Sequence, residues 1–194
     1  GLCGVSVSRL APTSFPSLPP ISGVSLAAAN CGIRYKDRPD LLVAEFSEGT
    51  TAAGVFTRSL TASAPVLACR DSLKSGCARV LVVNSGNSNA FTGKSGVASV
   101  ERVAAACEKQ FGCPPSHFYM ASTGVIGEKL PDDKIQAALV GLRFSDNTWE
   151  SAARAIMTTD TYPKMATRTA QIGGVNVTLN GIAKGSGMIA PDMA

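Results

Sequence analysis

Arg79-Val80-Leu81-Val82-Val83 opens the stretch that decides the fold. This continuous, largely β-branched run predicts a buried strand, because a strand covered on both faces shows no polar alternation. It is followed by the loop Asn84-Ser85-Gly86-Asn87-Ser88-Asn89-Ala90-Phe91-Thr92-Gly93-Lys94-Ser95 and by a predicted helix over residues 97–111. One face of that helix carries Val97, Val100, Val103, Cys107 and Phe111, and Gly112 and Pro114 end it. Strand, loop and helix in mixed succession indicate the α/β (or α+β) class, with packed sheets flanked by helices.

The loop after this strand has a glycine, a lysine and a serine in the order of a phosphate-binding loop. That motif requires a glycine five positions before Gly93, and Ser88 stands there, so we reject it. The loop is rich in asparagine, whose side chain bonds local backbone and tolerates left-handed conformations. We therefore expect a rigid loop held by its own amides; the alternative is that these amides help to position a substrate.

The remaining elements follow from local patterns. Further strands are predicted over residues 41–46, 52–57 (the neighbour of 41–46 across a turn at Glu48-Gly49), 64–69, 117–121 and 175–179, the last after a hairpin turn at Gly173-Gly174. Helices are predicted from about 130 to 140 and from 149 to 157, the second with a capping box over 147–150 and a core face of Trp149, Ala152, Ala153 and Ile156. Four prolines between residues 8 and 23 predict an extended arm, which wraps either a neighbouring chain or the body.

Composition and charge narrow the classes of protein to which the chain could belong. The 194 residues fit one domain or two small ones, and 45% hydrophobic with 16% charged residues is typical of a globular chain. The net charge of +4 comes without a run of basic residues, which argues against a nucleic-acid partner. The six cysteines include no C-x-x-C pair and His117 is the one histidine, so we expect no metal site. An even number of cysteines could form disulfides, but Cys31, Cys69 and Cys107 lie among apolar and small residues, as buried free thiols do, so we favour a reducing, cytoplasmic compartment. No apolar run is long enough to span a membrane.

Two polar clusters are candidates for chemistry. Ser122-Thr123-Gly124 follows the predicted strand over 117–121, where a hydroxyl and a closely approaching backbone N–H suit an oxyanion, although Ser-Thr-Gly is also common in turns. Thr158-Thr159-Asp160-Thr161 follows a core helix, and it is either a helix cap with a turn or a wall that binds a substrate. His117 is interpreted as a surface or capping residue at a strand entry.

The last fourteen residues, 181–194, combine Lys184, a Gly-Ser-Gly bend and an apolar run, and then the chain stops at Ala194. One interpretation is an arbitrary boundary or a disordered remainder. The other is a cut, with the polypeptide continuing as a second chain. That second interpretation matters because a threonine or serine freed at an N-terminus can act as a nucleophile with its own amine as base.

Four blocks of the chain resemble one family. Residues 82–90, 121–127, 155–164 and 182–194 look like the signature blocks of the ornithine acetyltransferases, also called bifunctional glutamate N-acetyltransferase/amino-acid acetyltransferases of arginine biosynthesis. Residues 49–65 add a weaker likeness. The likeness runs from roughly the proline-rich arm to the last residue, and four long blocks in order are specific. Asp192 departs from the family, where many members carry asparagine, and Ser88 departs where many carry alanine.

The resemblance implies a mechanism. Members are made as a precursor that cuts itself between an alanine and a threonine, so Ala194 would end an α chain, all of residues 1–194, and the catalytic threonine would begin a β chain. The threonine takes acetyl from N-acetylornithine and glutamate then accepts it, by a ping-pong route. Some members also use acetyl-CoA as donor, and no cofactor is implied. The implied fold is a two-chain α/β assembly similar to the N-terminal-nucleophile aminopeptidases, usually with two α and two β chains.

The resemblance also assigns residues. Thr123 and Gly124 match the oxyanion pair of the family, and Thr158 and Lys184 match substrate-binding positions. Lys184 suits an α-carboxylate, since an unpaired cation in a crowded site is costly. Two alternatives stay open: a self-processed aminopeptidase or amidase, in which water accepts the acyl group, and a non-enzymatic half-domain that binds another protein.

Overall fold

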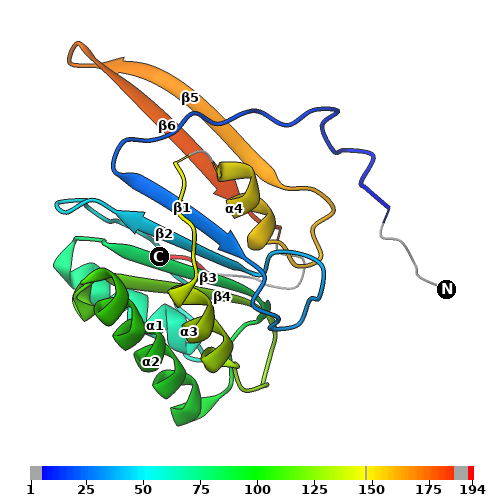
Figure 1. Ribbon diagram of the computed structural model, residues 1–194, viewed down its shortest axis with the longest axis vertical. Coiled ribbons are helices and arrows are strands. Elements are labelled where there is room, and N and C mark those ends of the chain that lie inside the picture. The colour runs from blue at the N-terminus through cyan, green and yellow to red at the C-terminus, as the bar shows by residue number, and fades with distance from the viewer. Residues whose placement is uncertain (1–5, 147, 186–191) are drawn as a thin grey trace.

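A four-stranded mixed sheet forms the centre of the molecule in the computed structural model, which describes residues 6–146, 148–185 and 192–194 (Figure 1). The strands lie in the order β1 (Val24–Ala29), β2 (Leu41–Phe46), β3 (Val80–Asn87) and β4 (Phe118–Val125). β1, β2 and β3 are antiparallel neighbours, whereas β3 and β4 run parallel. A separate two-stranded sheet is formed by β5 (Lys164–Ile172) and β6 (Val175–Ala183). The mixed α/β class is confirmed.

Helices cover both faces of the central sheet. Figure 1 shows α1 (Ala64–Ser72), α2 (Gly93–Phe111) and α3 (Asp132–Val140) together on one side, and α4 (Trp149–Ala155) on the other. A short 3-10 turn, Leu73–Ser75, follows α1, and a second one, Pro115–His117, leads into β4. The long parallel connection from β3 to β4 therefore runs through α2, as a crossover between parallel strands requires.

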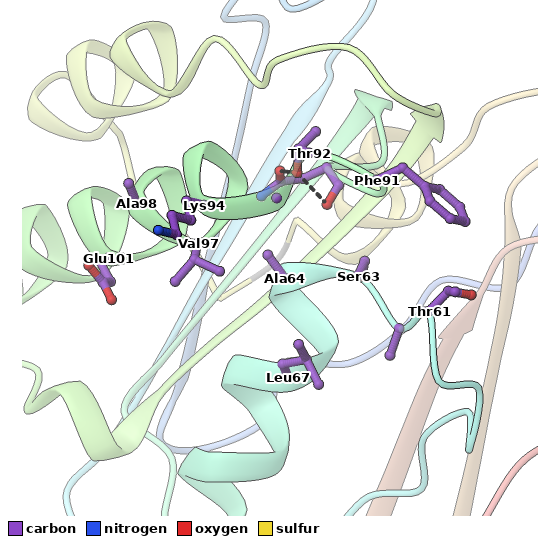
Figure 2. Close-up of a pocket in the computed structure, with 13 residues that line it drawn as sticks. Thr61, Ser63, Ala64, Leu67, Phe91, Thr92, Lys94, Val97, Ala98 and Glu101 are labelled. Carbon is purple, nitrogen blue, oxygen red and sulfur yellow. Dashed lines mark hydrogen bonds between the residues drawn. The ribbon is translucent and has the colours of Figure 1, made fainter.

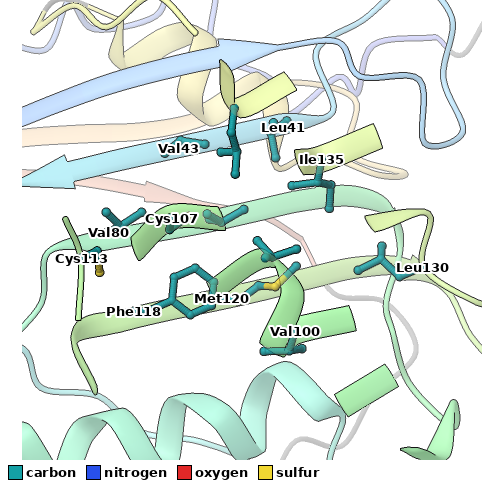
Figure 3. Close-up of a cluster of buried hydrophobic side chains, with 13 residues drawn as sticks. Leu41, Val43, Val80, Val100, Cys107, Cys113, Phe118, Met120, Leu130 and Ile135 are labelled. Carbon is teal, nitrogen blue, oxygen red and sulfur yellow. The ribbon is translucent and has the colours of Figure 1, made fainter. Parts of the chain in front are cut away.

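The sheet residues alternate between two cores. Leu41, Val43, Val80, Val82 and Met120 point to the side of α1, α2 and α3, where they meet buried side chains of α2 and α3 (Figure 3). Leu42, Ala44, Leu81 and Val83 point to the other side, where they pack against Ala152, Ala155 and Ile156 of the α4 segment. Because side chains alternate along a strand, each later position of β3 and β4 can be assigned to one of these two sides.

Two predicted strands are wrong. Residues 52–57 form no strand, and single bridges join Thr51 to Cys77 and Thr57 to Met193. Both edges of β2 are already paired, with β1 and β3, which leaves no edge for a third partner. Residues 64–69 belong to α1, where Pro65 stands in the first turn. Proline suits that position because its missing N–H would have no helical partner, and it would break a strand ladder.

β1 is absent from the strands predicted by sequence. Its residues, Val-Ser-Leu-Ala-Ala-Ala, have weak strand propensity, and pairing with β2 imposes the extended form. The other elements are confirmed with shifted ends: α2 begins at Gly93, β3 continues to Asn87, and the hairpin turn lies at Gly173 and Gly174. Gly112 ends α2 in the left-handed conformation with φ 67°. Thr148 stands at the N-cap of α4 without a side-chain cap bond, and Asn147 of the predicted capping box lies outside the described residues.

The proline-rich arm, predicted to be extended, has turns at residues 8–11 and 21–24 and no helix or strand between them, and it lies on the body of the chain. Asn180 Nδ2 of β6 donates to the Pro19 carbonyl over 2.7 Å, and the Ser8 N–H donates to Thr161 Oγ1 over 3.1 Å. Cys31, Cys69, Cys77, Cys107 and Cys113 are free thiols, and burial raises the pKa of Cys107 to about 12, with Cys113 adding to the shift. Among the described helices, none has the length and apolar character that a membrane crossing demands.

Candidate active site

The carboxyl ends of β3 and β4 bring two glycines into close contact. Gly86 lies opposite Gly124 in the parallel register, and their φ angles are 100° and 134°. A Cβ added to Gly124 would lie 2.5 Å from the Gly86 carbonyl carbon and 2.6 Å from the Asn87 nitrogen. No side chain fits there, and such φ values favour glycine. The geometry therefore explains why glycine follows Thr123.

The asparagine-rich loop is held by its own amides, as predicted. Asn84 Nδ2 donates to the Asn87 carbonyl over 2.9 Å, and Asn87 Oδ1 accepts the Asn89 N–H over 2.8 Å. Asn89 Nδ2 donates to the Gly96 carbonyl over 3.1 Å, which ties the loop to the first turn of α2. All three asparagines are buried. Their side-chain amides hold the backbone of the loop, and this fixes the position of Gly86 within it.

Thr123 presents a free hydroxyl beside Gly124. It lies opposite Ser85 and shares the parity of Leu81 and Val83, so its side chain is on the α4 side of the sheet. Thr123 is half-buried, and its Oγ1 bonds no residue in the described part of the chain. The neighbouring Ser122 differs, because its Oγ donates to Asn84 Oδ1 over 2.6 Å. Thr123 can therefore donate to a group outside this chain.

Thr158 and the segment after β6 meet at one carboxylate, that of Asp160. Its oxygens accept the Thr158 N–H over 3.3 Å, Lys164 Nζ over 2.7 Å and the Gly185 N–H over 2.6 Å. The side chain is 1% exposed. Burial alone would raise the pKa of Asp160, but the hydrogen bonds from Lys164, Gly185 and Thr158 outweigh it and lower the pKa to about 2. Sequence reasoning placed Asp160 among the threonines but missed Lys164 as its ion-pair partner.

Lys184 lies next to this centre. It follows β6, whose Ala183 pairs with Lys164. Lys184 is half-buried, its Nζ donates to the Gly185 carbonyl over 2.6 Å, and it forms no ion pair with any described acid. The cation is thus available to an external carboxylate, and Asp160 fixes the backbone on which Lys184 stands.

The contacts of Arg38 indicate where Thr158 lies relative to Thr123. It donates to the carbonyls of Thr158 and Met157 at the end of the α4 segment, with 3.4 Å to Thr158 O. Arg38 lies just before β2, and Leu41 of β2 pairs with Asn84 at the carboxyl end of β3. Thr158 therefore lies at the same end of the sheet as Thr123 and on the same side, that of α4. No hydrogen bond joins Thr123 to Thr158 or Lys184 in the described part of the chain.

Residues 192–194 pair with the segment after β2. The Phe56 N–H donates to the Ala194 carbonyl over 3.0 Å and the Ala194 N–H donates back over 2.9 Å. Arg58 Nε donates to Asp192 Oδ1 over 3.2 Å in an exposed ion pair. Ala194 is thus held by backbone pairing. Residues 186–191 of the predicted terminal segment, with its Gly-Ser-Gly bend, lie outside the described residues.

A cavity is found away from these residues. A cavity of about 520 Å³ opens between the N-terminal ends of α1 and α2, lined by Ala64, Leu67 and Val97 among others (Figure 2). It is on the other side of the sheet from α4, and it includes none of the predicted site residues. Within the described ranges, no group of three or more His, Cys, Asp or Glu is placed to hold a metal.

Comparison with known proteins identifies the family. The sequence model of the ArgJ family matches residues 25–194. The chain belongs to the ArgJ family. It is 54% identical to the arginine biosynthesis bifunctional protein ArgJ of Agrobacterium fabrum, over 98% of this chain and 46% of that protein. The same protein of Mesorhizobium japonicum is 55% identical, over 97% of this chain and 46% of its own length. The chain spans about half the length of the curated relatives it matches.

Solved structures of the ArgJ family share the fold. A crystal structure of the arginine biosynthesis bifunctional protein ArgJ from Bacillus halodurans has a TM-score of 0.84 at 34% identity, covering 89% of this chain and 92% of that one. A structure of ornithine acetyltransferase complexed with ornithine from Mycobacterium tuberculosis has a TM-score of 0.80 at 36% identity, covering 90% and 94%. The fold expected from the resemblance is therefore the one observed.

Proposed function

We propose that this chain is the α chain of a self-cleaved acetyltransferase of arginine biosynthesis, which moves acetyl from N-acetylornithine to glutamate. The observation that carries the proposal is membership of the ArgJ family, together with 36% identity to a protein solved as ornithine acetyltransferase with ornithine bound. We treat residues 1–194 as one functional portion. Acetyl-CoA is a candidate second donor, and the reaction needs no metal or cofactor.

Thr123 and Gly124 supply the oxyanion site in this proposal. The hydroxyl of a threonine outside this chain attacks the acetyl carbonyl, and negative charge develops on the carbonyl oxygen. The free Thr123 hydroxyl and the backbone at Gly124, fixed against Gly86, stabilise that oxygen. The tetrahedral intermediate expels the ornithine amine, which takes up a proton, and leaves an acetyl-enzyme. The glutamate amine then attacks the acetyl-enzyme and releases the threonine.

Thr158 and Lys184 bind the amino-acid part of the substrates. The Lys184 ammonium has no acidic partner among the described residues, which suits it to an α-carboxylate. Asp160 holds the backbone of Thr158 and Gly185 in place over 3.3 and 2.6 Å. Asp160 thus acts as a positioning residue, because it fixes the two segments rather than the substrate.

Ala194 is the residue after which we propose that the precursor cuts itself. Its backbone pairing with Phe56 would hold the scissile peptide in an extended form. The share of 46% that this chain covers in its curated relatives leaves room for a second chain of similar size. We propose that two α and two β chains assemble in the cytoplasm, where the free thiols of the described cysteines would stay reduced.

The proposal is tested with the full-length gene product. Denatured intact mass should give a 194-residue chain and an equal amount of a second chain that begins with threonine. The purified protein should then transfer acetyl from N-acetylornithine to glutamate. Release of free acetate with no transfer to glutamate would instead favour the aminopeptidase or amidase alternative. An uncut, inactive polypeptide would contradict the proposal.

A further inference from the structure

Ser85 carries a buried hydroxyl that no residue satisfies. The residue is 0% exposed, and its Oγ has no hydrogen-bond partner in the described part of the chain. Burying a hydroxyl without a partner is unfavourable, and most buried polar side chains are bonded. The Ser85 hydroxyl therefore does nothing for the stability of this chain as it stands.

The register places this hydroxyl beside Thr123. Ser85 and Thr123 are direct partners in the parallel pairing of β3 with β4, one position before the close contact of Gly86 with Gly124. Directly paired residues of neighbouring strands point to the same face of a sheet. Both follow the positions of Leu81 and Val83, so both point to the α4 side. Two hydroxyls without partners thus lie next to each other at the proposed oxyanion site.

The preceding pair of residues in this register provides a comparison, because its polar side chains are bonded within the chain. Asn84 and Ser122 are also direct partners, and they point to the opposite face. Ser122 Oγ donates to Asn84 Oδ1 over 2.6 Å, while Asn84 Nδ2 donates to the Asn87 carbonyl over 2.9 Å. That pair is satisfied within the chain. The pair of Ser85 and Thr123 is not, although it occupies the equivalent place on the other face.

We propose that Ser85 is a positioning residue for Thr123 in the acetyl-transfer reaction. When the acetyl group is bound, the Ser85 hydroxyl donates to Thr123 Oγ1. The Thr123 hydrogen is then directed to the reacting carbonyl oxygen, because a hydroxyl oxygen that accepts one hydrogen bond has its own hydrogen left to donate. The inference rests on the proposed function, since it assigns a role within the same site.

The test compares Ser85→Ala with Ser72→Ala in the full-length protein. Ser72 is a matched control, because it is also a buried serine but its Oγ donates to the Phe118 carbonyl over 2.7 Å. Ser85→Ala should lower kcat by about 3- to 10-fold, the loss expected for one hydrogen bond, with KM within twofold and Tm unchanged or raised. Ser72→Ala should lower Tm by about 3 °C and leave kcat unchanged. All rates are divided by the fraction of cleaved protein, measured by intact mass.

A double-variant cycle separates positioning from a general structural role. In a Thr123→Val background, where no hydroxyl remains to be oriented, Ser85→Ala should change kcat by less than twofold. A full 3- to 10-fold loss in that background would overturn the inference, as would unchanged kcat in Ser85→Ala alone. Failure of the unchanged protein to transfer acetyl would overturn the proposed function instead, so the two failures are distinguishable.

Discussion

The parallel pair β3–β4 and the antiparallel hairpin β5–β6 are two strand pairs of similar length with opposite surroundings. Six positions of β3 and β4 that carry large apolar side chains face one of two cores, and Val80, Val82 and Met120 are at most 1% exposed. In the hairpin, which pairs along its whole length, Ile172, Val175 and Leu179 are 65%, 63% and 68% exposed. Both regions therefore consist of paired strands, but only in β3–β4 are the apolar side chains buried.

The difference in burial indicates which of the two strand pairs depends on a further part of the protein for cover. The central sheet has helices on both faces, whereas an isolated two-stranded ribbon is marginally stable in water and its exposed apolar side chains call for cover. Because the curated relatives are about twice as long as this chain, we expect the remainder of the full-length protein to cover the hairpin. The carboxyl end of β3–β4 is held by contacts within this chain, whereas we expect the hairpin to need cover from the rest of the protein.

The largest effect is expected from Gly124→Ala. A Cβ at 2.5 Å from the Gly86 backbone and a φ of 134° force the two strand ends apart, so we expect a loss of about 4 kcal/mol in the free energy of unfolding. Gly181→Ala in β6 is the matched control, because a Cβ there meets nothing within 4 Å. That variant should stay within about 0.5 kcal/mol of the parent. Equal losses in denaturant titrations would erase the contrast between the two regions.

The next effect compares a leucine of the central sheet, in β2, with a leucine of the hairpin. Leu41→Ala removes a side chain that is 0% exposed and should cost about 3 kcal/mol in both the 194-residue chain and the full-length protein. Leu179→Ala should cost less than about 0.5 kcal/mol in the 194-residue chain and more in the full-length protein, where we expect the hairpin to be covered. A cost for Leu179→Ala that is equally small in both would mean that the hairpin stays in solvent.

A smaller effect is expected at Asp160, which holds the end of the hairpin through Lys164 and Gly185. Its pKa is about 2 in the folded chain and near 3.8 when unfolded, so its contribution is present above pH 4 and is lost as the pH falls through 2. The size of this contribution is about 2 kcal/mol. Asp160→Asn should remove that part of the pH dependence in unfolding titrations between pH 2 and 5. Asp71→Asn, at an exposed surface pair with Lys74, should leave the curve unchanged.

The sequence predicted the elements whose signals are local. β3 is a continuous apolar run, α2 repeats apolar residues on one face and ends at Gly112, and the β5–β6 turn contains two glycines, so each could be predicted without knowing its neighbours. β1 and α1 could not. The alanine-rich β1 is extended because β2 pairs with it, and the apolar start of α1 resembled a strand although Pro65 favours a helix. Local propensity is weak evidence where tertiary pairing decides.

The residues of the candidate site also divide into those that local sequence predicts and those that depend on the tertiary fold. Thr123 and Gly124 drew attention because they follow the predicted strand over residues 117–121, although β4 continues through them to Val125; the contact with Gly86 explains the position of the glycine. The Asp160 centre could not be predicted, since it depends on Gly185, twenty-five residues along the chain. The unsatisfied hydroxyl of Ser85 is likewise invisible without the register of β3 on β4. The roles of Thr123, Gly124, Thr158, Lys184 and Ala194 stay predictions.

The most direct test of the central claim, that the carboxyl end of β3–β4 stabilises the reacting oxygen, is the acetyl-transfer rate of Thr123→Val. The substitution keeps the shape of a half-buried side chain and removes the hydroxyl that we propose donates to the reacting oxygen. We predict that kcat for transfer from N-acetylornithine to glutamate falls by about 10²- to 10³-fold in the cleaved full-length protein, with an unfolding midpoint close to that of the parent. A kcat within twofold of the parent would contradict the claim.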